Sequence, residues 1–140
     1  MLSAGACVVA AIVVATGFAT TRGQRRASPP GPETIAQLRA KTVDWASQND
    51  EPRPGGGRVV ATTRNSFYGG NVDSDQPVYV VQVHGRFVGY RFPTPRGKPL
   101  RRGTVLVLVY DAQTLEITDW ELQPADHDLS AYGDVVSLDR

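Results

Sequence analysis

The chain has little cysteine and lacks the common catalytic motifs. Its one cysteine, Cys7, lies within an uncharged N-terminal stretch, so an intramolecular disulfide is excluded and thiols do not indicate the redox compartment. Neither the Gly-x-Ser-x-Gly turn of serine hydrolases nor the Gly-Lys-Ser/Thr ending of a phosphate loop occurs. We therefore predict a protein that is not an enzyme and holds no cofactor or metal.

Acidic residues are missing from one long segment. Between Asp75 and Asp111 there is none, although six basic residues lie there: Arg86, Arg91, Arg96, Lys98, Arg101 and Arg102. The bias reverses after Asp111, where the tail is acidic. The formal net charge of +1 argues against nucleic acid as a partner.

The N-terminal 19 residues carry no charged side chain. The apolar run 2–19 is at the lower limit for crossing a bilayer and long for a signal-peptide core. A buried core helix is the alternative, but three prolines between 29 and 32 separate the run from the remainder of the chain. We predict a membrane span or signal over 1–19, a flexible linker over 20–32, and one domain over 33–140.

The charges around the apolar run bear on which side of the membrane the domain lies. Arg22, Arg25 and Arg26 follow the apolar run, and counting these charges alone would leave the C-terminal side in the cytoplasm. A mis-assigned start codon would hide an upstream basic stretch and reverse that count. The excess of Arg over Lys, with much Ala, Gly, Pro and Val, is typical of GC-rich bacterial genomes. We expect a membrane-anchored or secreted protein with an extracytoplasmic domain.

One amphipathic helix opens the domain. Pro32 suits the first helical position, and Glu33 places negative charge near the positive end of the helix dipole. Apolar positions then recur with helical spacing over about four turns, at Ile35, Leu38, Thr42 and Trp45. The helix is predicted to end near residues 48–52.

Four strands are predicted after the helix, over 58–68, 77–92, 104–110 and 115–122. The run 104–110 is apolar on both faces, which indicates a central strand, and residues 111–114 form a tight turn. We expect a bulge near Asp119 and Trp120, and a tail over 123–140 that docks on the sheet. The fold class is α+β, with one helix packed on a four-stranded antiparallel meander.

The order of one helix and four strands, with the strand 105–111 leading into Asp111-Ala112-Gln113-Thr114, resembles the PepSY-like small bacterial envelope domains. Residues 78–87 and the ending 128–138 are also similar to uncharacterised membrane-anchored proteins of GC-rich bacteria. The resemblance covers residues 33–138 and implies fold and envelope location, but no catalytic residues. PepSY-like domains are proposed to modulate proteases or act as envelope sensors. This chain has Leu115 where their turn usually has glycine.

The most distinctive predicted surface is the segment 91–103, where prolines block strand pairing and favour a protruding loop. Its basic residues, with Arg86, could bind anionic lipid or an envelope polymer. The alternative is a solvated loop, or one neutralised by the acidic tail. A protein partner could instead pair with a sheet edge, for which the second or first predicted strand is the expected site.

Three other functions are open. A small-ligand carrier would have a pocket between helix and sheet near Trp45, Phe67 and Tyr79. Alternate oxygen donors in 71–75 have the spacing that begins a calcium loop, but residues 76 and 82 are glutamines instead of the required glycine and glutamate. Asp126-His127-Asp128 with His84 could ligate a metal or serve a small hydrolase. For each motif, a polar loop or a strand histidine is the simpler interpretation.

Overall fold

A computed structural model describes residues 27–139. The predicted segment 1–19 and linker residues 20–26 lie outside them. Within 27–139 no helix is both long and apolar enough to cross a membrane. The elements, in chain order, are α1 (Pro32–Ser47), β1 (Gly55–Thr63), α2 (Arg64–Phe67), β2 (Pro77–Val88), β3 (Arg102–Asp111), β4 (Ile117–Gln123), the 3₁₀ turn η1 (Leu129–Ala131) and β5 (Val135–Ser137).

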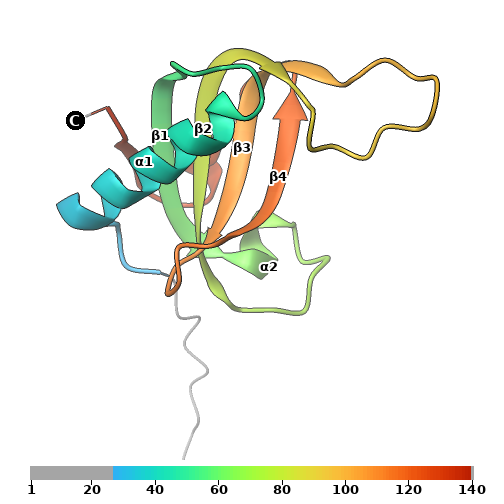
Figure 1. Ribbon diagram of the computed structural model, residues 1–140. Helices are drawn as coiled ribbons and strands as arrows, with labels where there is room; N and C mark the ends of the chain where they lie inside the picture. Colours follow the sequence, from blue (N-terminus) through green and yellow to red (C-terminus); the bar gives the residue numbers. More distant parts are fainter. Residues whose placement is uncertain (1–26, 140) are drawn as a thin grey trace, which may run out of the picture.

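The α+β class is confirmed, and the strand count is corrected. Strands β1 to β4 form the predicted antiparallel meander, but β5 pairs with β1 and makes a five-stranded sheet of order β4-β3-β2-β1-β5 (Figure 1). The tail therefore docks on the sheet as predicted, but as an edge strand. Three residues are too short to show the alternation that identifies a strand in sequence.

Helix α1 forms where it was predicted, with proline in its first turn. Leu38, Thr42 and Ala46 are buried, while Ile35 and Trp45 are half-buried. The helix crosses the sheet in front of β1, β2 and β3 and stops before β4 (Figure 1). One edge of the sheet is thus left without a helix over it.

Two predicted strands are too long. The first ends at Thr63 instead of residue 68, because the Thr63 hydroxyl accepts the Ser66 N–H at 3.2 Å and caps α2. The second ends at Val88 instead of residue 92, since Phe92 N donates to Gly89 O at 3.2 Å and the chain turns away from β3 there. Val, Thr and aromatic residues continue past both ends, so composition alone does not mark these boundaries.

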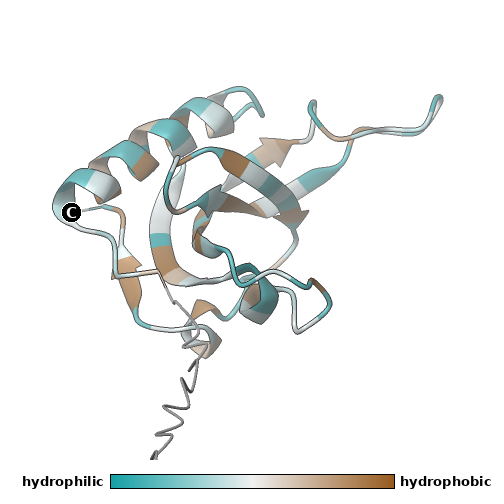
Figure 2. Ribbon diagram, turned by 90° about the horizontal axis from the view of Figure 1, so that it is seen from below, coloured by the Kyte–Doolittle hydropathy of each residue, from teal (hydrophilic) through white to brown (hydrophobic). Residues whose placement is uncertain are grey.

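The sheet is buried on both faces. The α1 side holds one core cluster, which includes Tyr79, Val81, Val83 and Phe87 of β2, as their predicted common face requires. The opposite face holds a second cluster, covered by η1 and flanked by Phe67 and Tyr132. Hydrophobic residues accordingly concentrate in the strands, whereas α1 and the long β2–β3 loop are largely hydrophilic (Figure 2).

The antiparallel order gives the sheet two chemically different ends. The upper end in Figure 1 contains the start of β1, the end of β2 and the start of β3, from which the long loop protrudes. The lower end contains α2, the β3–β4 turn and the first described residues. There the Tyr79 hydroxyl donates to Ser28 O at 3.3 Å and Pro30 is buried, so the end of the predicted linker lies against the sheet.

The β3–β4 turn has the predicted tight geometry. One Asp111 carboxylate oxygen accepts the N–H groups of Gln113 and Thr114 at 2.7 and 2.9 Å. Hydrogen bonds, first that from the Thr114 backbone, hold the pKa of Asp111 below its ordinary value. Leu115 follows with φ 55°, the left-handed region that favours glycine. The predicted irregularity of β4 occurs as a register shift at Thr118.

A buried hydrogen bond joins helix and sheet, between the Tyr110 hydroxyl and Thr42 Oγ1 at 2.9 Å. Tyr110→Phe should lower the free energy of unfolding by about 1–2 kcal/mol, because it leaves the Thr42 hydroxyl unpaired. Burial raises the pKa of Tyr110 to about 12. The stability that the neutral phenol contributes is complete below pH 10 and is lost as the pH rises toward 12.

Urea unfolding of the wild type and of Tyr110→Phe between pH 8 and 12 tests the contribution of Tyr110. Part of the alkaline loss of stability should disappear in Tyr110→Phe, while Tyr90→Phe, at an exposed position, should behave like the wild type. Identical pH profiles for the wild type and Tyr110→Phe would contradict the buried position of Tyr110.

Candidate binding surface at the basic end of the sheet

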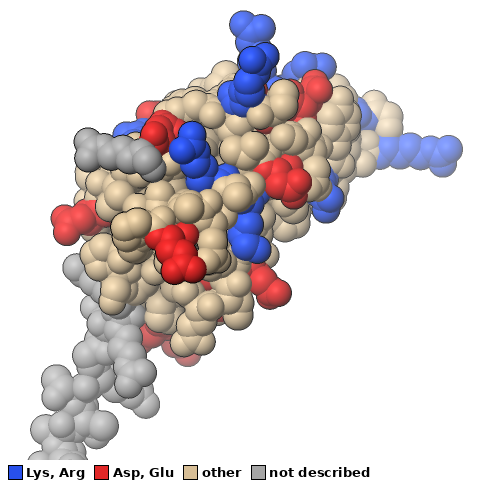
Figure 3. Space-filling model, turned by 60° about the vertical axis from the view of Figure 1, so that its left-hand side comes forward, with Lys and Arg blue, Asp and Glu red and all other residues tan. Residues whose placement is uncertain are grey.

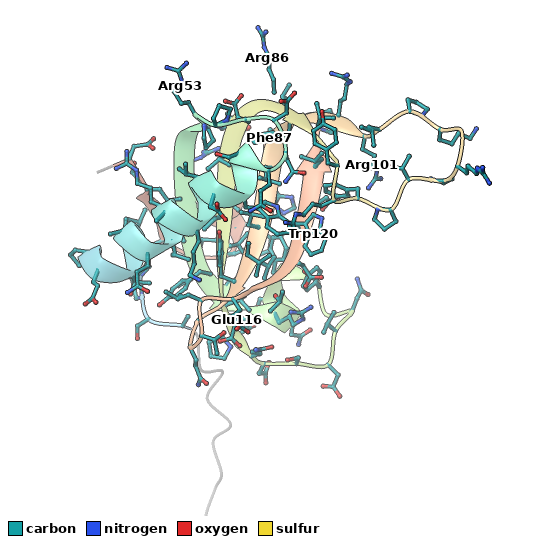
Figure 4. All side chains as sticks on the ribbon, viewed as in Figure 1. Arg53, Arg86, Phe87, Arg101, Glu116 and Trp120 are labelled. Atoms are coloured by element: carbon teal, nitrogen blue, oxygen red, sulfur yellow. The ribbon has the colours of Figure 1, made fainter. Side chains whose placement is uncertain are left out.

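The six basic residues identified in the sequence come together at the upper end of the sheet. Arg86 lies near the end of β2 and Arg102 starts β3, while the other four are carried by the loop 89–101 between these strands. Arg53 joins them from the α1–β1 connection, and Figure 4 shows Arg53 and Arg86 pointing outward at this end. We call these seven residues the basic end: Arg53, Arg86, Arg91, Arg96, Lys98, Arg101 and Arg102.

The tip of the loop is an ordered turn. Lys98 N donates to Pro95 O at 3.0 Å, and Gly97 between them has φ 81°, as the third position of a type II turn requires. Arg96 and Lys98 flank this glycine and are exposed. The turn therefore presents two cations at the point farthest from the sheet (Figure 1).

The base of the loop is held by aromatic rings. The Arg91 guanidinium lies 4.9 Å from the centre of the Trp45 ring and donates to Gln48, and Arg101 lies 5.7 Å from the Phe92 ring. Phe92 is only 9% exposed and meets Trp120 edge-on. Cation–π contacts of this kind fix an arginine in place without neutralising it. Arg91 and Arg101 therefore position the loop and keep their charge.

The acidic tail does not neutralise the basic end. Within residues 27–139 no carboxylate forms an ion pair with any of its seven members. Glu51 instead accepts the backbone N–H groups of Arg53 and Arg86, at 3.2 and 2.9 Å. The space-filling view shows Lys and Arg side chains extending from the top and right of the domain, with Asp and Glu side chains between them and over the lower part (Figure 3).

The basic end has a shallow cavity of about 400 Å³ at its base, between the end of β2, the start of β3 and Pro124. Arg86 and Arg102 line it with Thr104. Neither arginine has an ion-pair partner among the described residues, so an anionic group could contact both. Sequence reasoning missed Arg53, because that residue lies in a separate segment that only the fold brings to this end.

The histidine and aspartate candidates form structural contacts. His84 Nε2 lies 2.5 Å from Asp126 Oδ1, and Arg58 pairs with the other Asp126 oxygen at 2.8 Å. His127 points elsewhere, with its Nε2 2.9 Å from the Tyr132 hydroxyl. In the described part of the chain no three His, Cys, Asp or Glu residues are grouped to hold a metal ion. This includes the segment 71–75, where Asn71 donates to Tyr68 O.

The three residues expected to line a helix–sheet pocket, Trp45, Phe67 and Tyr79, do not come together. Phe67 packs with the second core cluster, whereas Trp45 and Tyr79 belong to the α1 side, so the sheet separates them. Phe67 was expected within the first strand, but it lies in α2, where the alternation of strand side chains between the two faces no longer applies. A cavity of about 290 Å³ does open between α1 and the start of β1, lined in part by Arg39 and Arg53.

The chain matches no known family model, no curated protein and no solved structure. Function is therefore inferred from the geometry of the described residues.

The contacts of Asp126 predict a small, pH-dependent effect of Asp126→Asn. Its contacts with Arg58 and His84 are both exposed, so the loss of stability near pH 7 should not exceed about 1 kcal/mol. The hydrogen bond from His84, aided by the charges of His84 and Arg58, lowers the pKa of Asp126 below its ordinary value of 3.8. The contribution is thus present above that value and is lost as the pH falls below it.

Thermal unfolding at pH 7 and pH 3 measures this difference, with Asp134→Asn as an exposed control of the same charge change. A failure of Asp126→Asn to fold, or a difference that grows toward pH 3, would show that Asp126 has another role.

Proposed function

We propose that the protein is a non-catalytic, membrane-tethered envelope module that binds an anionic polymer through the basic end. The observation that carries this proposal is the gathering of seven cations at one end, none of which forms an ion pair with a carboxylate among residues 27–139. Mutual repulsion of these cations costs folding free energy. A bound polyanion offsets that cost and gains about 1 kcal/mol for each cation it meets near a charged surface.

The position of the described N-terminus favours a polymer over the lipid of the tethering bilayer. Ala27 and Ser28 lie at the lower end of the sheet, and the basic end lies at the opposite end (Figure 1). A tether attached to the lower end would direct the basic end away from its own membrane. Headgroups of that bilayer are thus the less favoured anionic partner.

The extracytoplasmic location of the module is also part of the proposal. It is supported by the apolar segment 1–19 and by the resemblance to PepSY-like envelope domains. The left-handed conformation of Leu115 is consistent with that resemblance, because it occurs where the envelope domains usually have glycine.

Polyanion binding is tested with the double variant Arg96→Gln/Lys98→Gln. Removing the two cations of the turn should weaken binding about tenfold or more, since each contributes roughly 1 kcal/mol. The measurement is the salt concentration at which the full chain, in neutral detergent, elutes from immobilised polyphosphate. The slope of log affinity against log salt should also fall.

The control is Lys41→Gln on the exposed side of α1, compared with Lys98→Gln alone in the turn. It should elute close to the wild type. Equal loss of binding in both variants would mean that only net charge matters and would contradict a defined binding end.

Orientation is tested by adding trypsin outside the cytoplasmic membrane of intact spheroplasts. The exposed arginines and lysine of the loop 89–101 should be cut there, because the domain is expected on the outer side. Protection of the loop until the membrane is opened would place the domain in the cytoplasm and remove the envelope part of the proposal.

A further inference from the structure

The sheet has one long free edge, and it is not the edge expected from the sequence. The first two strands were the predicted sites for an added strand, but β1 and β2 each have neighbours on both sides. β4, seven residues long, pairs only with β3 within the described chain, while the other edge strand, β5, has three residues. A free strand of this length offers backbone N–H and C=O groups to an extended segment.

The side of β4 that faces α1 is apolar. Trp120 is 36% exposed, and its ring lies 5.1 Å from that of Trp45 and 6.2 Å from that of Phe92. Leu122, on the same side, is half-buried against the core. Figure 4 places Trp120 on the side of the sheet next to the protruding loop. Apolar side chains of an added strand would cover this aromatic surface and remove it from water.

The other side of β4 is acidic. Asp119 and Glu121 alternate with Trp120, and they edge a cavity of about 160 Å³ lined by Phe67, Tyr68, Val107 and Val109. We call this the acidic pocket. Burial first, and then Asp119 and Glu121, raise the pKa of Tyr68 to about 12, although Arg64 opposes the shift. Both carboxylates therefore act on the interior of the pocket.

The acidic pocket suits a lysine or arginine side chain. Its aromatic and valine walls can receive the apolar stem, while the carboxylates meet the charged head. The chain already shows this chemistry, since Arg64 pairs with Asp119 and lies 5.4 Å from the Tyr68 ring centre. Glu121 has no ion pair within residues 27–139, so one carboxylate is free for an incoming cation.

A second copy of the chain is a poor occupant of the β4 edge. Antiparallel pairing of two β4 strands around Trp120 would place Asp119 of each copy opposite Glu121 of the other. Like charges directly opposite each other destabilise a strand pair. The edge is thus protected against self-association while it remains complementary to a strand of opposite charge.

We infer that β4 binds an extended segment of a partner protein whose apolar and basic residues alternate. The apolar residues face Trp120, and the lysines or arginines face Glu121 and the acidic pocket. The apolar side of the site adjoins the base of the loop 89–101, whereas the acidic pocket lies on the opposite face of the sheet and selects the opposite charge. The inference stands whether or not the basic end binds a polyanion.

The test uses synthetic decapeptides that alternate Lys with Val or Glu with Val, added to the full chain in neutral detergent. Binding is measured by the change in tryptophan fluorescence. The Lys/Val peptide should bind at least tenfold more tightly than the Glu/Val peptide. Amide exchange of β4 should slow when it binds. Slowing confined to β5 or to the loop 89–101, or equal affinity for both peptides, would overturn the inference.

Charge reversal provides the specific variant. Glu121→Lys should weaken Lys/Val binding at least tenfold and strengthen Glu/Val binding, because the side chain is exposed and its change leaves the core intact. Glu116→Lys, an equal change at the lower end of the sheet, should leave both affinities within twofold. Equal effects of the two variants, or a β4-mediated dimer without peptide, would contradict the proposed occupant. Arg96→Gln/Lys98→Gln should not change peptide binding, so the two proposals can fail separately.

Discussion

Burial of the sheet on both faces is the constraint on which the rest of the structure depends. Strands β2 and β3 carry apolar side chains on both faces of the sheet, and both faces must be removed from water. Helix α1 covers one side, and η1, flanked by Phe67 and Tyr132, covers the other. Because α1 lies across β1, β2 and β3 and contacts β4 through Trp45, the outer edge of β4 remains open.

The same meander also decides where charge accumulates. Each strand runs opposite to the one before it, so successive connections between strands lie at opposite ends of the sheet. The segment without acidic residues spans β2, the long loop and most of β3, and its cations therefore gather at the upper end. The acidic residues near the β3–β4 turn fall at the lower end, where Glu116 is seen in Figure 4. A nearly neutral chain thus folds into a domain with a basic end.

The sequence was most informative where a periodic pattern was long. The helical stripe through Leu38 and Thr42 and the two-sided apolar run of β3 each predicted their element and its burial. It was least informative where contacts join distant segments. The pairing of β5 with β1, the position of Arg53 and the contact of His84 with Asp126 all depend on the tertiary fold. The basic loop was predictable because its residues are contiguous, whereas the β4 edge required the order of the strands.

Residue-resolved hydrogen exchange of the full chain tests the central claim most directly, namely that a doubly covered β3 lies beside an open edge strand. In β3 the amides of residues 105–110 should all exchange slowly. In β4 slow and fast amides should alternate, since every second N–H points away from β3. Uniformly slow exchange along β4, or fast exchange within residues 105–110, would contradict the account.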